Sequence, residues 1–135
     1  MKIIIFDTEY LSLSKKHSNI KSIIKFRKKL FPEIIQISFL KCSNIFSKGI
    51  KKKLNIFIKI KQKIPSRITK LTKIKSSTLK KKGFYFTESM NLIDKFIDRN
   101  SILIANGDDA KILKLNVKFN KFNNIKKKLI NFVNL

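Results

Sequence analysis

The chain has 135 residues, of which 43% are hydrophobic, so it is long and apolar enough for one globular domain and too short for two. Its 32 Lys and Arg residues against 8 Asp and Glu give a formal net charge of +24, which favours polyanionic partners, nucleic acid first. Part of this charge also fits the compositional bias of an A+T-rich coding sequence, because Lys, Ile, Asn and Phe are all over-used.

The single cysteine, Cys42, excludes an intramolecular disulfide and fits a reducing compartment. We expect it to be a small buried side chain on a strand. No apolar run reaches the roughly 18 residues of a membrane-spanning helix, and the first residues lack the order of a signal peptide. The sequence therefore predicts a soluble, cytoplasmic protein with no membrane partner.

The chain opens with an apolar strand that ends in two acids. Residues 3–6 (IIIF) are typical of a strand that is buried on both faces. Asp7 and Glu9 follow, and alternation along a strand places both on the same side. Two neighbouring acids repel each other and are costly to desolvate, so this pair predicts a bound cation.

Residues 10–31 are expected to form a basic insertion or loop with a weak helical pattern. Two interpretations stay open, a flap that contacts phosphates and a solvated surface insertion. His17, the only histidine, lies here, and we expect it to be exposed rather than a ligand.

Two further strands are expected after this insertion. Residues 32–42 alternate, and one face holds Ile35, Ile37 and Phe39. Glu33 just before them is expected to be a solvated strand end. Residues 43–53 predict a hairpin-type connection, and residues 53–63 predict a strand whose lysine-rich outer face suits the edge of a sheet. The three strands together predict an antiparallel meander.

Helices are expected in the second half of the chain. Residues 65–83 predict short helices or turns, followed by an amphipathic helix that Thr87 caps and Asn100 closes. Its expected apolar stripe holds Ser89, Leu92, Ile93, Phe96 and Ile97.

A fourth strand is predicted at residues 101–105, and a fifth at residues 126–135. Between them the Asn106-Gly107 turn leads Asp108 and Asp109 into the first turn of another helix. This order predicts an α/β fold, with a mixed five-stranded sheet and flanking helices over residues 1–135. A right-handed crossover lays the fourth strand parallel to the first, so Asp109 approaches Asp7 and Glu9.

Three converging carboxylates indicate a site for Mg²⁺ or Mn²⁺, because these ions prefer oxygen ligands. Two such ions about 3.5–4 Å apart can hold a phosphodiester, activate a water and stabilise the leaving oxygen. Asp109 also has a simpler explanation, since an acid in the first turn of a helix complements the helix dipole.

The sequence resembles the DEDD superfamily of 3′–5′ exonucleases, which share the ribonuclease-H-like fold. IIIFDTEY is similar to the first motif of that superfamily, and FPEIIQISFLK to its P-x-E-I-I-x-I strand. KQKIPSRITKLTKI resembles the P…LT-x-LTGI element, with Lys73 where glycine usually stands. ILIANGDDAKILKLN is similar to the second motif. The resemblance implies catalytic and metal-binding roles for Asp7, Glu9 and Asp109, and is nearest the exoribonuclease-like members.

Members of that superfamily continue into a helix with a final H-x4-D or Y-x3-D motif, which supplies the general base and the last metal ligand. No acid follows Asp109 in this chain. The resemblance therefore implies a domain that is truncated at its C-terminus, with part of the sheet left uncovered. A second chain or segment that completes the domain is one expectation.

Three functions remain open at this point. The first is a metal-dependent 3′–5′ exonuclease acting on RNA or single-stranded DNA. The second is a catalytically inactive, truncated relative that binds nucleic acid through its basic surface. The third is a basic module without an enzymatic origin, which leaves Asp7 and Glu9 unexplained.

Overall fold

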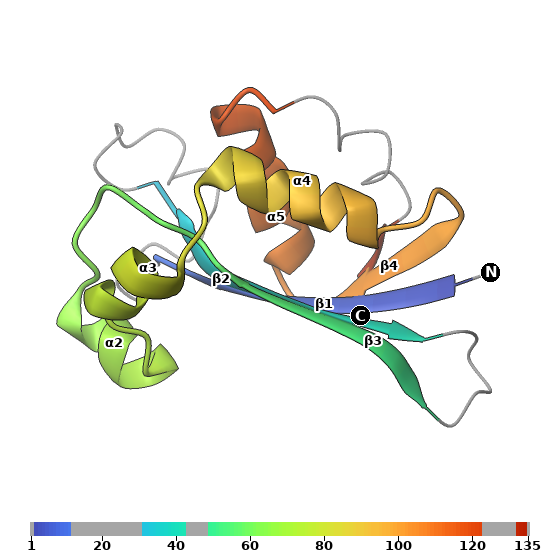
Figure 1. The fold of residues 1–135 in the computed structure, drawn as a ribbon, viewed down its shortest axis with the longest axis horizontal. Helices are drawn as coiled ribbons and strands as arrows, with labels where there is room; N and C mark the ends of the chain where they lie inside the picture. The colour runs from blue at the N-terminus through green and yellow to red at the C-terminus, as the bar shows by residue number, and fades with distance from the viewer. Residues whose placement is uncertain (1, 12–30, 43–48, 123–131, 135) are drawn as a thin grey trace.

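The computed structural model describes residues 2–11, 31–42, 49–122 and 132–134 (Figure 1). Its five strands form one sheet in the order β3-β2-β1-β4-β5. They are β1 (Lys2–Tyr10), β2 (Ile34–Cys42), β3 (Ile50–Phe57), β4 (Ser101–Ala105) and β5 (Phe132–Asn134). The pairs β1–β2 and β2–β3 are antiparallel, whereas β1–β4 and β4–β5 are parallel. The predicted mixed sheet is therefore confirmed, with the lysine-rich β3 at its edge.

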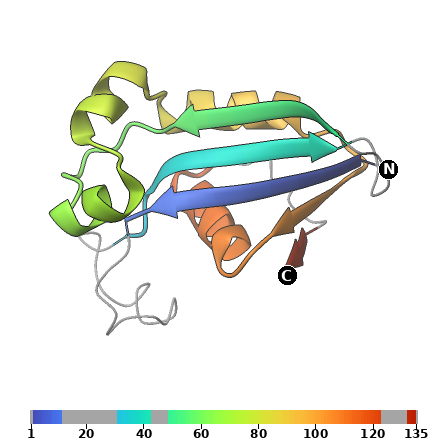
Figure 2. The same cartoon turned by 90° about the horizontal axis from the view of Figure 1, so that it is seen from below.

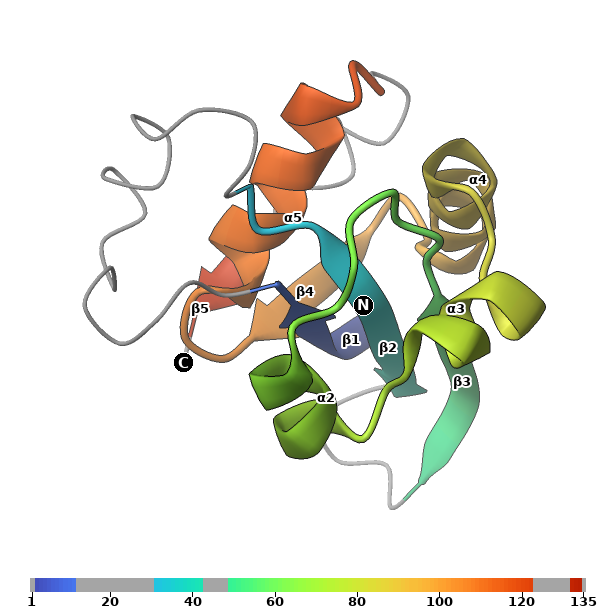
Figure 3. The same cartoon turned by 90° about the vertical axis from the view of Figure 1, so that its left-hand side faces the viewer.

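The described helices are α2 (Ser66–Thr72), α3 (Ser76–Lys82), α4 (Phe86–Phe96) and α5 (Asp109–Phe119). Figures 1 and 3 show α4 and α5 on one face of the sheet, with α2 and α3 grouped at the end where β1 terminates. None of the described helices is long and apolar enough to cross a membrane.

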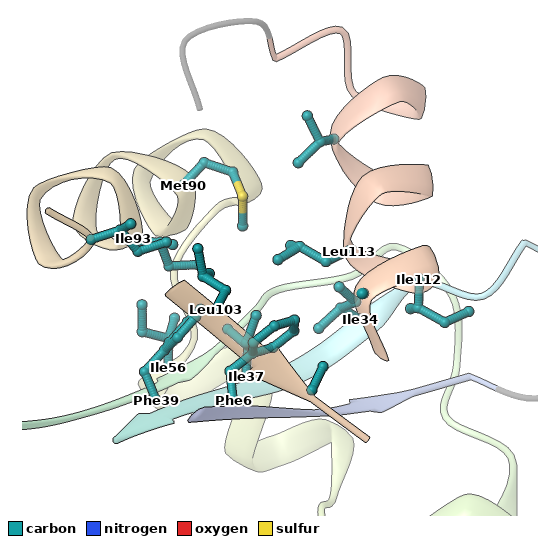
Figure 4. Close-up of a cluster of buried hydrophobic side chains, with 14 of the residues drawn as sticks. Phe6, Ile34, Ile37, Phe39, Ile56, Met90, Ile93, Leu103, Ile112 and Leu113 are labelled. Carbon is teal, nitrogen blue, oxygen red and sulfur yellow. The ribbon is translucent and has the colours of Figure 1, made fainter. Parts of the chain in front are cut away.

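The main core lies between the sheet and the pair α4 and α5 (Figure 4). Phe39 of β2 is fully buried at its centre, 5.4 Å from the ring of Phe6 and 5.9 Å from the ring of Phe96 between ring centroids. Met90 and Ile93 of α4 are also fully buried. Burial of each such side chain contributes about 1.5–3 kcal/mol, so this core holds the sheet and both helices together.

A second core cluster packs at the end of the opposite face, beneath α2 and α3. It consists of Leu11, Ile35, Ile64, Ile68, Ile74 and Leu79. The prediction that Ile35 shares a face with Ile37 and Phe39 is therefore wrong. A register shift pairs Glu9 with Gln36 and Tyr10 with Ile34, which gives β2 one extra residue and turns Ile35 away from the main core.

The middle of that opposite face is only partly covered. Ile5 is 44% exposed and Val133 is 46% exposed, and the strand register places both in one row with Ile104. The prediction that the first strand is buried on both faces is wrong at Ile5. Among the described helices, α4 and α5 cover only one face of the sheet, and α2 and α3 cover only the end of the other.

The boundaries of α4 also differ from the prediction. The helix begins at Phe86 and ends at Phe96, so Thr87 lies inside it and Asn100 beyond it. The backbone N–H of Tyr85 donates to the Glu88 carboxylate at 2.9 Å. A carboxylate three residues into the helix supplies the capping bond that was expected from Thr87.

The third strand lies several residues earlier than predicted, because β3 begins at Ile50 and ends at Phe57. Beyond it, Ile58 forms an isolated bridge with Phe84, while its backbone N–H still donates to the carbonyl of Ile35 on β2 at 3.0 Å. Cys42 is half-buried at the end of β2, not buried as expected. Most of the predicted insertion, with His17, and most of the predicted hairpin connection lie outside the described residues.

Lys73, which stands where the resembling exonucleases usually have glycine, has a backbone conformation that favours glycine. It follows α2 with φ 63° and ψ 8°, which is the left-handed conformation. A residue with a side chain adopts this conformation at a cost of about 1–2 kcal/mol, whereas glycine adopts it freely. The position therefore favours the glycine that the resemblance leads one to expect there.

Candidate active site

The two acids of β1 lie near its carboxyl end. Asp7 pairs with Ser38 and Glu9 with Gln36 on β2, and Thr8 between them is buried. Asp7 is exposed, whereas Glu9 is half-buried. Alternation along the strand thus puts both acids on the partly covered face and directs Thr8 to the face that carries α5.

The third acid reaches β1 through the parallel pairing of β4. Phe6 pairs with Ala105, so β4 ends beside the acids, and a turn with Gly107 at φ 59° then starts α5. The carboxylate of Asp109 accepts a hydrogen bond from the backbone N–H of Thr8 at 3.1 Å and a second one from its hydroxyl. Residues a hundred positions apart in sequence therefore meet around Thr8.

The three carboxylates influence one another electrostatically. Burial raises the pKa of Glu9, and the negative charges of Asp7 and Asp109 raise it further. Burial is also the largest cause that raises the pKa of Asp109, with a further contribution from Asp7, while the hydrogen bonds from Thr8 act in the opposite direction. Repulsion of this kind is relieved when a cation binds.

Thr8 and Tyr10 belong to this site, although the sequence did not single them out. Thr8 fixes Asp109, and Tyr10 is half-buried beside the acids. Burial raises the pKa of the Tyr10 hydroxyl, and the charges of Asp108, Asp109 and Glu9 raise it further. The one feature of the sequence that could have pointed to Thr8 and Tyr10 as site residues is their position within the D-T-E-Y segment, beside Asp7 and Glu9.

The other acids near this end of the sheet have structural partners. Asp108 is bound by Lys111 at 2.9 Å and stays partly exposed. Glu33 is half-buried, one of its oxygens has no hydrogen-bond partner, and burial raises its pKa. The expectation of a solvated strand end is therefore wrong for Glu33, because its side chain is half-buried and shares a hydrogen bond with Gln62.

The donor types at the site fit a divalent ion, since carboxylate oxygens are preferred by Mg²⁺ and Mn²⁺. Within the described residues, however, no three His, Cys, Asp or Glu side chains are grouped closely enough to hold a metal ion. The arrangement is a pair, Asp7 and Glu9, with Asp109 turned toward Thr8. A metal bound by all three acids requires Asp109 to reach it directly or through water.

Replacing Glu9 with glutamine is expected to raise the free energy of unfolding at pH 7, by less than about 1 kcal/mol because the site is partly exposed. The folded-state pKa of Glu9 is raised, so its contribution to stability falls as the pH rises through that pKa. The gain should therefore disappear near pH 4. Urea unfolding in EDTA at both pH values checks this.

The matched control is Asp108→Asn, which changes the net charge equally but removes an exposed acid that pairs with Lys111. It should not gain stability at pH 7. If Glu9→Gln is no more stable than this control at pH 7, the acids do not repel each other in the folded state.

The order and directions of the strands define the class of this protein as a ribonuclease-H-like α/β domain, with acids near the carboxyl ends of β1 and β4. Residues 4–135 match the RNase_T family model, which is described as an exonuclease. The chain belongs to this exonuclease family. No curated protein matches the sequence closely enough to count as a relative.

Several solved exonuclease structures have a similar fold. Exonuclease I from Methylocaldum szegediense has a TM-score of 0.72 at 11% identity and covers 99% of this chain and 27% of its own. A 3′-exonuclease studied for recognition of the histone mRNA stem-loop has a TM-score of 0.70 at 14% identity. The match covers 90% of this chain and 42% of the 3′-exonuclease chain. E. coli exonuclease I with a dT13 oligonucleotide has a TM-score of 0.61 at 10% identity. The match covers 85% of this chain and 22% of the exonuclease I chain. The chain thus spans less than half the length of each.

Proposed function

We propose that this chain is a metal-dependent 3′–5′ exonuclease-like protein that hydrolyses phosphodiester bonds of RNA or single-stranded DNA. The observation that carries the proposal is the pair Asp7 and Glu9 near the end of β1, with Asp109 bonded to the intervening Thr8 and close enough to raise the pKa of Glu9, in a chain with a net charge of +24. The nucleic acids named for the similar structures, a stem-loop RNA and an oligonucleotide DNA, support this class of substrate.

Members of the family generally use divalent metal ions. In this chain Asp7 and Glu9 would hold Mg²⁺ or Mn²⁺, and Asp109 would contribute as a third acid. Mg²⁺ keeps several waters and is often bound through only one or two carboxylates, so a preformed group of three is not required. A bound ion supplies an activated water and stabilises charge on the leaving oxygen. The lysines of the chain would contact the phosphate backbone without reading sequence.

A second candidate is a catalytically inactive relative that only binds nucleic acid. The sequence feature that favours it is the lack of any Asp, Glu or His in residues 110–135, so an H-x4-D motif does not follow Asp109 there. Without a general base the expected rate loss is about 10²–10⁴-fold. Under the first candidate, another segment or a second chain supplies this group. Cytoplasmic localisation remains a prediction in both.

Incubation of 5′-labelled single-stranded RNA and DNA with the protein and Mn²⁺ separates the two candidates. The exonuclease produces a ladder that shortens from the 3′ end and stops when EDTA is added. The inactive relative leaves the strands intact but binds them with an affinity that falls steeply as salt increases. Intact strands together with binding that does not depend on salt would contradict both candidates.

A further inference from the structure

A basic pocket of about 530 Å³ lies next to the second core cluster. Four of its nine lining residues are lysines and none is acidic. Leu79 lines the pocket and also packs in the cluster that contains Leu11, two residues beyond Glu9. Figures 1 and 2 show α2 and α3 at the end of the sheet where β1 terminates, so the pocket and the acids share this end.

Tyr85 gives this pocket an aromatic surface. Its side chain lies just before α4, the residue is 65% exposed, and Lys59 Nζ lies 4.8 Å from the ring centroid. Helix capping does not explain the ring, because Glu88 bonds the backbone N–H of Tyr85 and any residue except proline has that group. Core packing does not explain it either, since most of the residue is in solvent.

The backbone holds the two sides of the pocket together. Lys59 donates its N–H to the carbonyl of Phe84 at 2.8 Å, which brings Lys59 beside Tyr85 from a distant part of the sequence. Gly83 makes this approach possible, because a Cβ there would lie 2.4 Å from the carbonyl oxygen of Leu79 and 3.1 Å from the Lys59 nitrogen. The backbone at Lys59 and at Tyr85 is therefore held close together before any ligand binds.

We propose that this pocket binds an unpaired stretch of nucleic acid, with one base stacked on Tyr85 and adjacent phosphates on Lys59 and Lys80. Sites for single strands combine a positively charged groove with an aromatic ring of this kind. A strand whose 3′ end lies at Asp7 and Glu9 would place an upstream nucleotide in the pocket. The choice of nucleic acid as the partner rests on the proposed function, whereas the pocket and its aromatic ring do not.

The test is fluorescence anisotropy with a labelled single-stranded 12-mer and the corresponding blunt duplex, in EDTA so that the acid site takes no part. Tyr85→Ser is expected to weaken binding of the single strand roughly tenfold or more, which is the usual effect of losing one stacked base. Tyr85→Phe keeps the ring and should bind like the wild type. The duplex, whose bases are already stacked, should lose less than twofold with either variant.

The lysine contacts are tested with Lys80→Gln against Lys95→Gln, which makes the same change of charge in the last turn of α4. The Lys80 variant should bind the single strand more weakly than the Lys95 variant. Circular dichroism melts establish that each variant is folded.

Three results would overturn the proposal: wild-type binding by Tyr85→Ser, an equal loss for single strand and duplex, or equal effects of the two lysine changes. A competition experiment with inorganic polyphosphate gives one more such result. If polyphosphate removes all difference in single-strand binding between the wild type and Tyr85→Ser, the pocket recognises charge alone and the proposal is overturned. Because metal binding at the acids is measured separately, none of these results bears on the proposed exonuclease site.

Discussion

Replacing Asp7 with asparagine is expected to reduce metal-dependent trimming of 3′ ends by at least about 10³-fold, a loss of roughly 4 kcal/mol of transition-state stabilisation. Asparagine keeps the size of the side chain and removes its charge. Asp7 is exposed at the end of β1, so the change should leave the fold intact. Rates of shortening of a 5′-labelled strand in Mn²⁺ measure the effect.

Asp108→Asn is the matched control for this experiment. It makes the same chemical change beside Asp109, but at an acid that is partly exposed and bound by Lys111. Its rate should stay within a factor of about three of the wild type, because the loss of an exposed ion pair has little effect. Equal rates for the wild type and Asp7→Asn would mean that the trimming does not come from this site.

Replacing Asn116 with alanine is expected to lower the free energy of unfolding by about 2–4 kcal/mol. Asn116 is 2% exposed on α5, and its amide donates to the carbonyls of Pro32 and Ile112, both at 2.9 Å. Its oxygen accepts the N–H of Ile34 at 3.2 Å. Alanine leaves the N–H of Ile34 and the carbonyl of Pro32, at the start of β2, without these partners. The loss is large compared with the total free energy of unfolding of about 5–15 kcal/mol that is usual for a domain.

Urea unfolding measures this loss, with Asn120→Ala, at the residue that follows the end of α5, as the control. Asn120 is exposed, and its side-chain amide donates to the carbonyl of Asn116 at 2.9 Å. Its replacement should cost less than about 1 kcal/mol. Similar losses for both variants would show that Asn116 does not connect α5 to β2 in the way described.

Much of the sheet could be predicted because each strand carried its own pattern. Residues 3–6 indicated a strand, the lysines of β3 indicated an edge, and the handedness of the crossover brought Asp109 toward β1. The facing of Ile35 could not be predicted. It depends on an extra residue of β2 opposite β1, and an irregular register is a property of the pair of strands rather than of either sequence.

The candidate site was predictable as a set of residue types, but not in its detail. The spacing of Asp7 and Glu9 fixed their common side, whereas the contact between Asp109 and Thr8 arises only when α5 packs onto the sheet. The pocket of Tyr85 depends in the same way on the close approach that Gly83 permits. Contacts between distant segments decide both features, and local patterns carry no signal for them.

Asp7, Glu9 and Asp109 are proposed to form one site for a divalent ion. Titration calorimetry with Mn²⁺ tests this claim most directly, because it requires neither a substrate nor a general base. The wild type and Asp108→Asn should bind Mn²⁺ saturably with similar affinity, and Asp7→Asn and Asp109→Asn should each bind at least about tenfold more weakly, a difference of roughly 1.4 kcal/mol. Equal binding by all four proteins, or no binding by the wild type, would contradict the claim.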